Sequence, residues 1–184
     1  TLDKKVLIHC DKITNIVNVP EGIEMIGRIA FATIDEITYK VILPDGIIKI
    51  DESAFAFSYG LTQINFPDSL QSLGEYAFCG TELSTVLLPD SIEEIPEGCF
   101  QFVYIDELHL PSNLKHIRYA AFVGLCCEEV RLPQGIETVE GWSLSGHYEK
   151  IYIPKSIKIL ENDFYYEDGI EVEPEERKPI IEEY

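Results

Sequence analysis

Histidine and cysteine are the residue types in this sequence that most often act as nucleophiles, proton carriers or metal ligands. Zinc sites require them at short, regular spacings, and a catalytic thiol requires a histidine partner. The sequence contains four histidines and five cysteines: His9, His109, His116 and His147, with Cys10, Cys79, Cys99, Cys126 and Cys127. None of their spacings is typical of a metal site, and the odd number of cysteines fits no simple disulfide framework. We expect these cysteines to pack as small buried hydrophobes.

Adjacent carboxylates are the remaining candidates for acid–base chemistry. They occur as Glu93-Glu94, Glu128-Glu129 and Glu182-Glu183. Neighbouring residues of an extended chain point to opposite faces, so we interpret these pairs as solvated surface. The sequence also lacks the nucleophile-elbow, phosphate-loop and dinucleotide-binding motifs. We therefore expect a protein without enzymatic activity and without a cofactor or a metal.

The charge balance narrows the class of partner. The chain of 184 residues carries 14 Lys and Arg against 33 Asp and Glu, a net charge of −19. Basic side chains supply most of the affinity for nucleic acids and for anionic membranes, so neither is an expected partner. No apolar run approaches the roughly 18–20 residues that cross a bilayer, so direct membrane insertion is not expected. The hydrophobic fraction of 46% is enough for a folded core.

These residues are positioned by a repeat that proline marks. Seven prolines recur at intervals of 24, 23, 22, 22, 22 and 21 residues: Pro20, Pro44, Pro67, Pro89, Pro111, Pro133 and Pro154. A fixed period in the range of about 20–50 residues indicates a solenoid or a related array. An aliphatic residue stands three positions after every proline and six positions after the first six. An Ala-Phe pair, or a close variant, occupies positions ten and eleven after the first six prolines.

Each repeat predicts the same local structure. Apolar and polar residues alternate before each proline, as in 83–88, which indicates a half-buried strand. Proline at the second position of a turn would end that strand, and a second extended piece would follow. Asp51 and Pro96 are suited to begin a helix, so we expect single helical turns before the Ala-Phe pairs. The aromatic members of the pairs should stack as one column: Phe31, Phe55, Phe78, Phe100 and Phe122.

The fold predicted from these features is an α/β solenoid of mostly short parallel strands with single helical turns. Residues 1–19 lack the Ala-Phe pair and end in an alternating run, so we expect an N-terminal cap with the first strand. About seven repeats occupy residues 20–172. Residues 173–184 form an acidic tail, either a frayed end or a strap over the last turn.

Outward-pointing side chains of the strands should form two rows across the sheet. The candidate binding residues are Ile42, Leu87, His109, Arg131 and Tyr152 in one row and Glu107, Glu129 and Lys150 in the other. Tyr and Arg are enriched as anchors of protein interfaces, which favours Arg131 and Tyr152. Two other interpretations stay open, because single exposed hydrophobes are ordinary and because Arg131 and Tyr152 can stack on each other without any partner. Glu129 and Lys150, neighbours in their row, are expected to pair.

The pattern of proline, Gly or Ser, two spaced aliphatics, Ala-Phe and an alternating strand resembles the BspA-like, treponemal type of bacterial leucine-rich repeat. The resemblance implies a right-handed leucine-rich-repeat solenoid, and a cell-surface or secreted protein that serves in adhesion and protein recognition. The sequence departs from the family because Cys79 and Cys126 fall at different offsets from the Ala-Phe pair. No export or anchoring segment is recognised, so surface location rests on the resemblance and a cytoplasmic location stays open.

The sequence therefore predicts a non-enzymatic protein-interaction module that binds a protein partner through its strand face. The use that the family resemblance implies is adhesion or recognition at a bacterial surface. The alternative is a structural spacer or stalk, which holds another domain away from a surface and has no ligand of its own.

Overall fold

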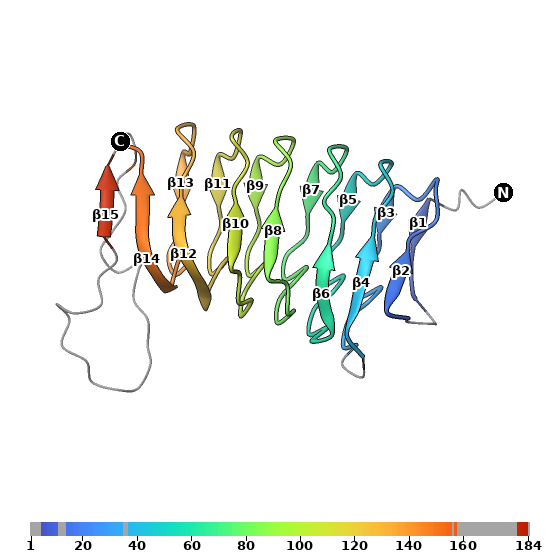
Figure 1. Ribbon diagram of the computed structural model, residues 1–184. Helices are drawn as coiled ribbons and strands as arrows, with labels where there is room; N and C mark the ends of the chain where they lie inside the picture. The colour runs from blue at the N-terminus through green and yellow to red at the C-terminus, as the bar shows by residue number, and fades with distance from the viewer. Residues whose placement is uncertain (1–4, 11–13, 35–36, 156, 158–179, 184) are drawn as a thin grey trace.

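The chain winds as a solenoid in which each turn contributes one strand to each of two parallel sheets (Figure 1). The computed structural model describes residues 5–10, 14–34, 37–155, 157 and 180–183. These residues make about six turns, and no helix occurs among them. Most of the expected seventh repeat and of the expected tail lies outside the described residues, so the division of the chain into cap, repeats and tail stays a prediction.

The front sheet consists of the strands that precede the prolines, together with the last strand of the chain (Figure 1). Its members are β2 (Ile16–Asn18), β4 (Tyr39–Ile42), β6 (Leu61–Ile64), β8 (Thr85–Leu87), β10 (Glu107–His109), β12 (Leu125–Arg131), β14 (Gly146–Ile153) and β15 (Ile180–Glu183). They pair in parallel in the groups β2-β4-β6, β8-β10 and β12-β14-β15. The predicted alternation is confirmed, since Tyr39 and Val41 are buried while Lys40 and Ile42 are exposed.

The back sheet consists of two-residue strands, and all of them except the first follow a proline. Its members are β1 (Val6–Leu7), β3 (Met25–Ile26), β5 (Lys49–Ile50), β7 (Ser72–Leu73), β9 (Glu94–Ile95), β11 (His116–Ile117) and β13 (Thr138–Val139). The turn between the sheets closes where the amide three positions after a proline donates to the proline carbonyl, as from Leu70 to Pro67 at 2.9 Å. Proline is therefore the first residue of this turn, and its prediction as the second was wrong. Closing the turn on the Leu70 amide carries the Leu70 side chain into the core, where it is fully buried.

The core contains the predicted column of phenylalanine rings. Successive ring centroids lie 4.8, 5.2, 5.3 and 5.4 Å apart from Phe31 to Phe122, and the ring planes agree within 12°. Phe66 adds an edge-on contact to Phe78, with centroids 5.5 Å apart. The small residue before each ring is buried as well, including Cys99, whose packing role is confirmed. None of the five cysteines, all of which lie among the described residues, forms a disulfide.

The segments that carry the Ala-Phe pairs are not helical, so the expected helical turns were wrong. The residue nine positions after the proline has a positive φ, 54° at Ser53 and 57° at Gly98, and this conformation cannot continue a right-handed helix. The amide of Phe55 donates to Ala77 of the next coil at 2.8 Å, which replaces an intrahelical bond. Asp51 and Pro96 are residues that suit a helix start, but these local preferences are outweighed by hydrogen bonds that every coil forms with its neighbour.

We call this set of hydrogen bonds the inter-coil ladder. It joins the amides nine, eleven and thirteen positions after each of the first five prolines to carbonyls of the next coil, as from Ser53, Phe55 and Phe57 at 2.9, 2.8 and 2.7 Å. Among the described residues of these segments, eight other than glycine adopt positive φ: Ile29, Thr33, Ser53, Phe57, Tyr76, Phe102, Ala120 and Trp142. This conformation costs an L-residue roughly 1–2 kcal/mol. The ladder therefore holds backbone conformations that most side chains disfavour.

Replacement of the central ring of the column should unfold more than one coil. Phe78 is fully buried and packs against Phe55, Phe66 and Phe100. We expect Phe78→Ala to lower the free energy of unfolding by about 3–5 kcal/mol, as measured by urea denaturation. The control Tyr104→Ala removes a ring that is 73% exposed and should change it by less than about 0.5 kcal/mol. A Phe78→Ala protein as stable as the control would show that the column does not support the fold.

Two neighbouring alanines test the cost of positive φ. Ala120 has a φ of 55° and Ala121 does not share that conformation, although both side chains are buried. Ala120→Gly should leave stability unchanged or raise it by up to about 1 kcal/mol, because glycine adopts this φ freely. Ala121→Gly should lower it by about 1.5 kcal/mol through the lost methyl group and the greater freedom of the unfolded chain. Equal losses in both variants would contradict a strained turn at Ala120.

Candidate binding surface

The front sheet places the predicted rows of outward side chains next to one another. In β8 and β10, Leu87 lies beside His109, and in β12 and β14 Arg131 lies beside Tyr152. The second row has the same order, with Glu129 beside Lys150. Strands β8, β10, β12 and β14 are neighbours in the sheet (Figure 1). The parallel pairing without offset therefore gathers four of the five predicted residues of the first row on one stretch of the surface.

Ile42 is the predicted residue that lies apart from this stretch. It is 45% exposed on β4, and the next coil contributes Asn65 between it and Leu87. The Asn65 side chain accepts a hydrogen bond from the Leu43 amide at 2.7 Å and donates one to the Leu43 carbonyl at 2.9 Å. The Asn65 amide group thus bonds to both backbone groups of Leu43, as a backbone amide of a neighbouring strand would. The exposed aliphatic groups of Ile42 and Leu87 are thus separated by a polar side chain already bound to the backbone.

Arg131, Tyr152 and Glu129 form one cluster. The guanidinium carbon of Arg131 lies 3.6 Å from the centroid of the Tyr152 ring, and its Nη2 lies 3.4 Å from Glu129 Oε2. The Tyr152 hydroxyl donates to Glu129 Oε1 at 3.5 Å. Glu129 contacts Arg131 on its own strand, whereas the pairing expected between Glu129 and Lys150 is not among these contacts. The cluster fixes the direction of Arg131 and leaves its side chain 58% exposed.

The rest of the predicted site is more loosely held. His109 Nε2 lies 3.5 Å from Glu107 Oε1, and both side chains are more than half exposed. Leu87 is 47% exposed and Lys150 is half-buried. Exposed pairs of this kind contribute little to stability. These side chains are therefore free to change partner without cost to the fold.

The back sheet differs because most of its basic side chains pair with carboxylates of a neighbouring coil, while Lys49 pairs with Asp51 of its own coil at 3.1 Å. The ion pairs between neighbouring coils are Lys5–Glu24, Arg28–Glu52, Lys115–Glu93, Arg118–Glu94 and Arg118–Glu140. Arg118 bridges two coils, with Nη2 2.5 Å from Glu94 and Nη1 2.8 Å from Glu140. The hydrogen bonds from Arg118 and from the Tyr119 amide hold the pKa of Glu140 below its usual value. The cations of this sheet thus already have carboxylate partners.

The other potentially reactive side chains among the described residues do not cluster into a site. Cys126 is exposed on β12, and burial raises the pKa of the neighbouring Cys127 thiol to about 12, so that it is protonated near neutral pH. Among the described residues, no group of three or more His, Cys, Asp and Glu is arranged to hold a metal ion. The same residues include no helix with the length and apolar character needed to span a bilayer.

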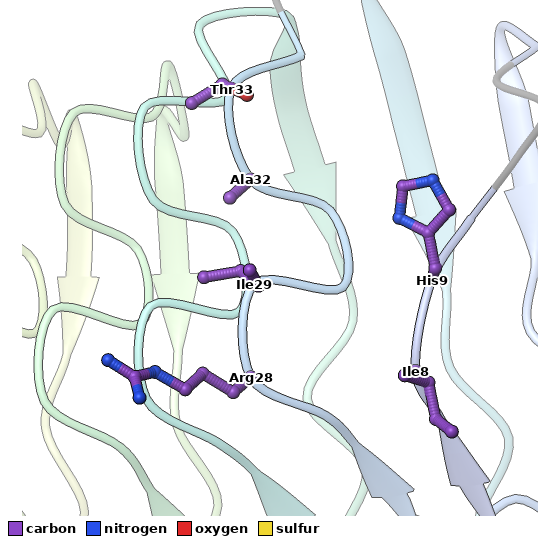
Figure 2. A pocket seen from close by; sticks show the side chains of 6 residues that line it. All are labelled: Ile8, His9, Arg28, Ile29, Ala32 and Thr33. Atoms are coloured by element: carbon purple, nitrogen blue, oxygen red, sulfur yellow. The ribbon is translucent and has the colours of Figure 1, made fainter.

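A hollow of about 590 Å³ lies at the N-terminal end of the solenoid. Figure 2 shows that it separates Ile8 and His9 of the first segment from the turn that carries Arg28, Ile29, Ala32 and Thr33. The Arg28 side chain points away from His9 and pairs with Glu52. The described residues that line the hollow include no carboxylate and no thiol, and so they form no triad of nucleophile, base and acid.

Comparison with known families settles the kind of repeat. The family described as the BspA type leucine-rich repeat region matches this chain in six copies, over residues 24–149 and 102–171. The chain belongs to this family. The leucine-rich repeat assignment made from the sequence is thus confirmed, whereas no curated protein matches the chain significantly. Leucine-rich repeats are repeat modules associated with protein interaction, which agrees with the row of outward-pointing side chains on the front sheet.

The sequence did not predict a further exposed group of this leucine-rich repeat solenoid. Phe57 and Phe102 stand thirteen positions after Pro44 and Pro89, and both rings are about half exposed on the turn segments. These exposed rings could have been inferred from the sequence, because Gly80 and Gly124 occupy the same position in the third and fifth repeats. An aromatic residue that alternates with glycine at one place of a repeat indicates a surface feature rather than core packing.

The bridging arginine gives a pH-dependent contribution to stability. Because Arg118 lowers the pKa of Glu140 in the folded state, its stabilising effect is present above the ordinary carboxyl pKa and is lost as the pH falls through the folded value. Arg118→Met keeps the side-chain stem and removes the charge. We expect its destabilisation in urea to be larger at about pH 7 than at about pH 3. A loss of the same size at both values would show that the stem, and not the charge, stabilises the fold.

Proposed function

We propose that this protein is a non-enzymatic protein-interaction module that binds a partner protein through the front sheet of repeats four to seven. The observation that carries the proposal is the ordered cluster of Arg131, Tyr152 and Glu129, which continues the row of Leu87 and His109. Arg and Tyr are the residue types most enriched among interface hot spots. Lys115 and Arg118 of the back sheet are held more closely, by carboxylates of neighbouring coils at 2.5–2.8 Å, than Arg131 is held by Glu129 at 3.4 Å.

The cluster also reduces the entropic cost of association. Arg131 is held over the Tyr152 ring, so a partner carboxylate meets a guanidinium whose side chain is already ordered. Leu87 supplies exposed apolar area at the far end of the row. The anchors in this proposal are Arg131 and Tyr152, with His109, Glu107 and Lys150 at the rim. Adhesion to a protein at a cell surface is the use that the family resemblance favours.

A structural spacer without any ligand is the second candidate. It is supported by the self-contained cluster, because Arg131 and Tyr152 satisfy each other in the free protein. The two functions differ in what the front sheet contributes. A spacer tolerates any fold-preserving change on this sheet, whereas a binding module does not.

The test is capture of partners from an extract of the native source by immobilised protein, with quantitative mass spectrometry. The double variant Arg131→Ala with Tyr152→Ala should reduce the specifically captured protein by about tenfold or more, since hot-spot residues cost at least about 1–2 kcal/mol when truncated. The matched control, Lys115→Ala with Glu93→Ala, removes an exposed ion pair of the back sheet and should capture as the wild type does. Both variants should keep the wild-type circular dichroism spectrum.

Capture that is equal in all three proteins would place the contact elsewhere and contradict the assignment of the anchors. Retention of no protein above the bare matrix would favour the spacer.

A further inference from the structure

Six exposed aromatic residues lie on the turn segments: Phe57, Tyr59, Phe102, Tyr104, Tyr119 and Trp142. Four of them form two equivalent pairs. We define the turn face as positions eight to fifteen after the second to sixth prolines: residues 52–59, 75–82, 97–104, 119–126 and 141–148. Phe57, Tyr59, Phe102 and Tyr104 are 45%, 50%, 56% and 73% exposed. The first two occupy the same positions in the second repeat as the last two in the fourth. The repeat thus places two equivalent aromatic pairs on one face, two coils apart.

The backbone fixes where these rings lie. Phe57 and Phe102 have φ of 56° and 59°, and the inter-coil ladder holds both amides. A Cβ atom at Gly80 would lie 3.0 Å from the Phe57 ring, and one at Gly124 would lie 3.4 Å from the Phe102 ring. Each ring therefore lies over a glycine of the following coil. The glycines leave the space that these rings occupy, so the ring positions are built into the backbone.

The turn face contains acidic side chains and no Lys or Arg. Its acidic residues are Glu52, Glu75, Glu82 and Glu97. Glu52 pairs with Arg28, and Glu97 accepts a hydrogen bond from the Tyr76 hydroxyl. Glu82 is exposed and stands fifteen positions after Pro67, in the coil between those of Tyr59 and Tyr104. A carboxylate thus lies in the coil between two exposed phenol rings. The arginine at the equivalent turn of the first repeat, Arg28, is already paired with Glu52.

We propose that the turn face is a second interaction surface, which binds an extended, arginine-bearing segment of a partner protein. A guanidinium stacks on aromatic faces and bonds to carboxylates at the same time, which an ammonium does less well. The protein contains this combination on its front sheet, where Arg131 lies 3.6 Å from the Tyr152 ring centroid and contacts Glu129. The turn face supplies the rings and the carboxylate of that arrangement, and the partner supplies the arginine.

The spacing of the two aromatic pairs favours one pattern in the partner. Coils of a parallel sheet are about 4.8 Å apart, so the pairs are separated by roughly 10 Å. An extended polyproline-type segment rises about 3.1 Å per residue and returns to the same side every third residue, roughly 9 Å along. Arginine at every third position therefore brings successive guanidinium groups to successive aromatic pairs.

The test is the fluorescence anisotropy of a labelled peptide that contains three arginines separated by two prolines each. We expect saturable binding to the wild-type protein, and binding at least about tenfold weaker to Phe102→Ala with Tyr104→Ala. The variant Glu82→Gln preserves the shape of the face and should also weaken binding, which keeps the test valid if the double variant folds poorly. Ile48→Ala is the matched control, because this side chain is 42% exposed and lies outside both the turn face and the front-sheet row, and it should bind as the wild type does.

Three outcomes would overturn the proposal. The first is no binding, and the second is equal binding of a lysine version of the peptide that does not depend on the rings, which would indicate diffuse attraction to an acidic protein. The third is ring-dependent retardation by a soluble neutral polysaccharide together with no binding of the arginine peptide. That result would make the rings a sugar-stacking surface instead.

Discussion

The inter-coil ladder is the constraint on which the rest of the structure depends. Each bond from one coil to the next, such as Phe55 N to Ala77 O at 2.8 Å, fixes the two segments in register. The phenylalanine rings then stack in nearly parallel planes, because equivalent residues of successive coils lie at the same place within each coil. The same register requires positive φ at residues such as Ile29 and Trp142, which free chains avoid. Stability and strain thus arise from one set of contacts.

The surface positions of the repeat can differ in residue type from coil to coil without changing the backbone, and we expect function to depend on these positions. Equivalent positions of successive coils lie side by side, so a single substitution in a repeat adds one side chain to a surface row. On the back sheet the rows pair acid with base, as at Arg118, and on the front sheet they include the cluster of Arg131 and Tyr152. The turn face differs from both, since it combines rings with acids and contains no Lys or Arg. One backbone thus carries three chemically distinct faces.

The features that repeat were predictable from the sequence, and those that depend on competition between contacts were not. The strands before the prolines, the ring column and the buried Cys99 follow from hydrophobic spacing alone. The helical turns expected at Asp51 and Pro96 do not form, because a local preference gives no information about hydrogen bonds to the next coil. The contact of Glu129 with Arg131 depends on rotamers, which spacing does not determine. The seventh repeat and the binding roles of the predicted residues stay predictions.

The most direct test of this account is hydrogen exchange of the backbone amides in the Ala-Phe segments, resolved by residue with NMR. If the inter-coil ladder holds the coils together, the amides of Phe55, Phe78 and Phe100 exchange only through global unfolding, with protection equal to the free energy of unfolding. The neighbouring amides that close local turns, such as Ala56 to Ser53, exchange faster through smaller openings. Rapid exchange at Phe55, Phe78 and Phe100 under native conditions would contradict the ladder as the basis of the fold.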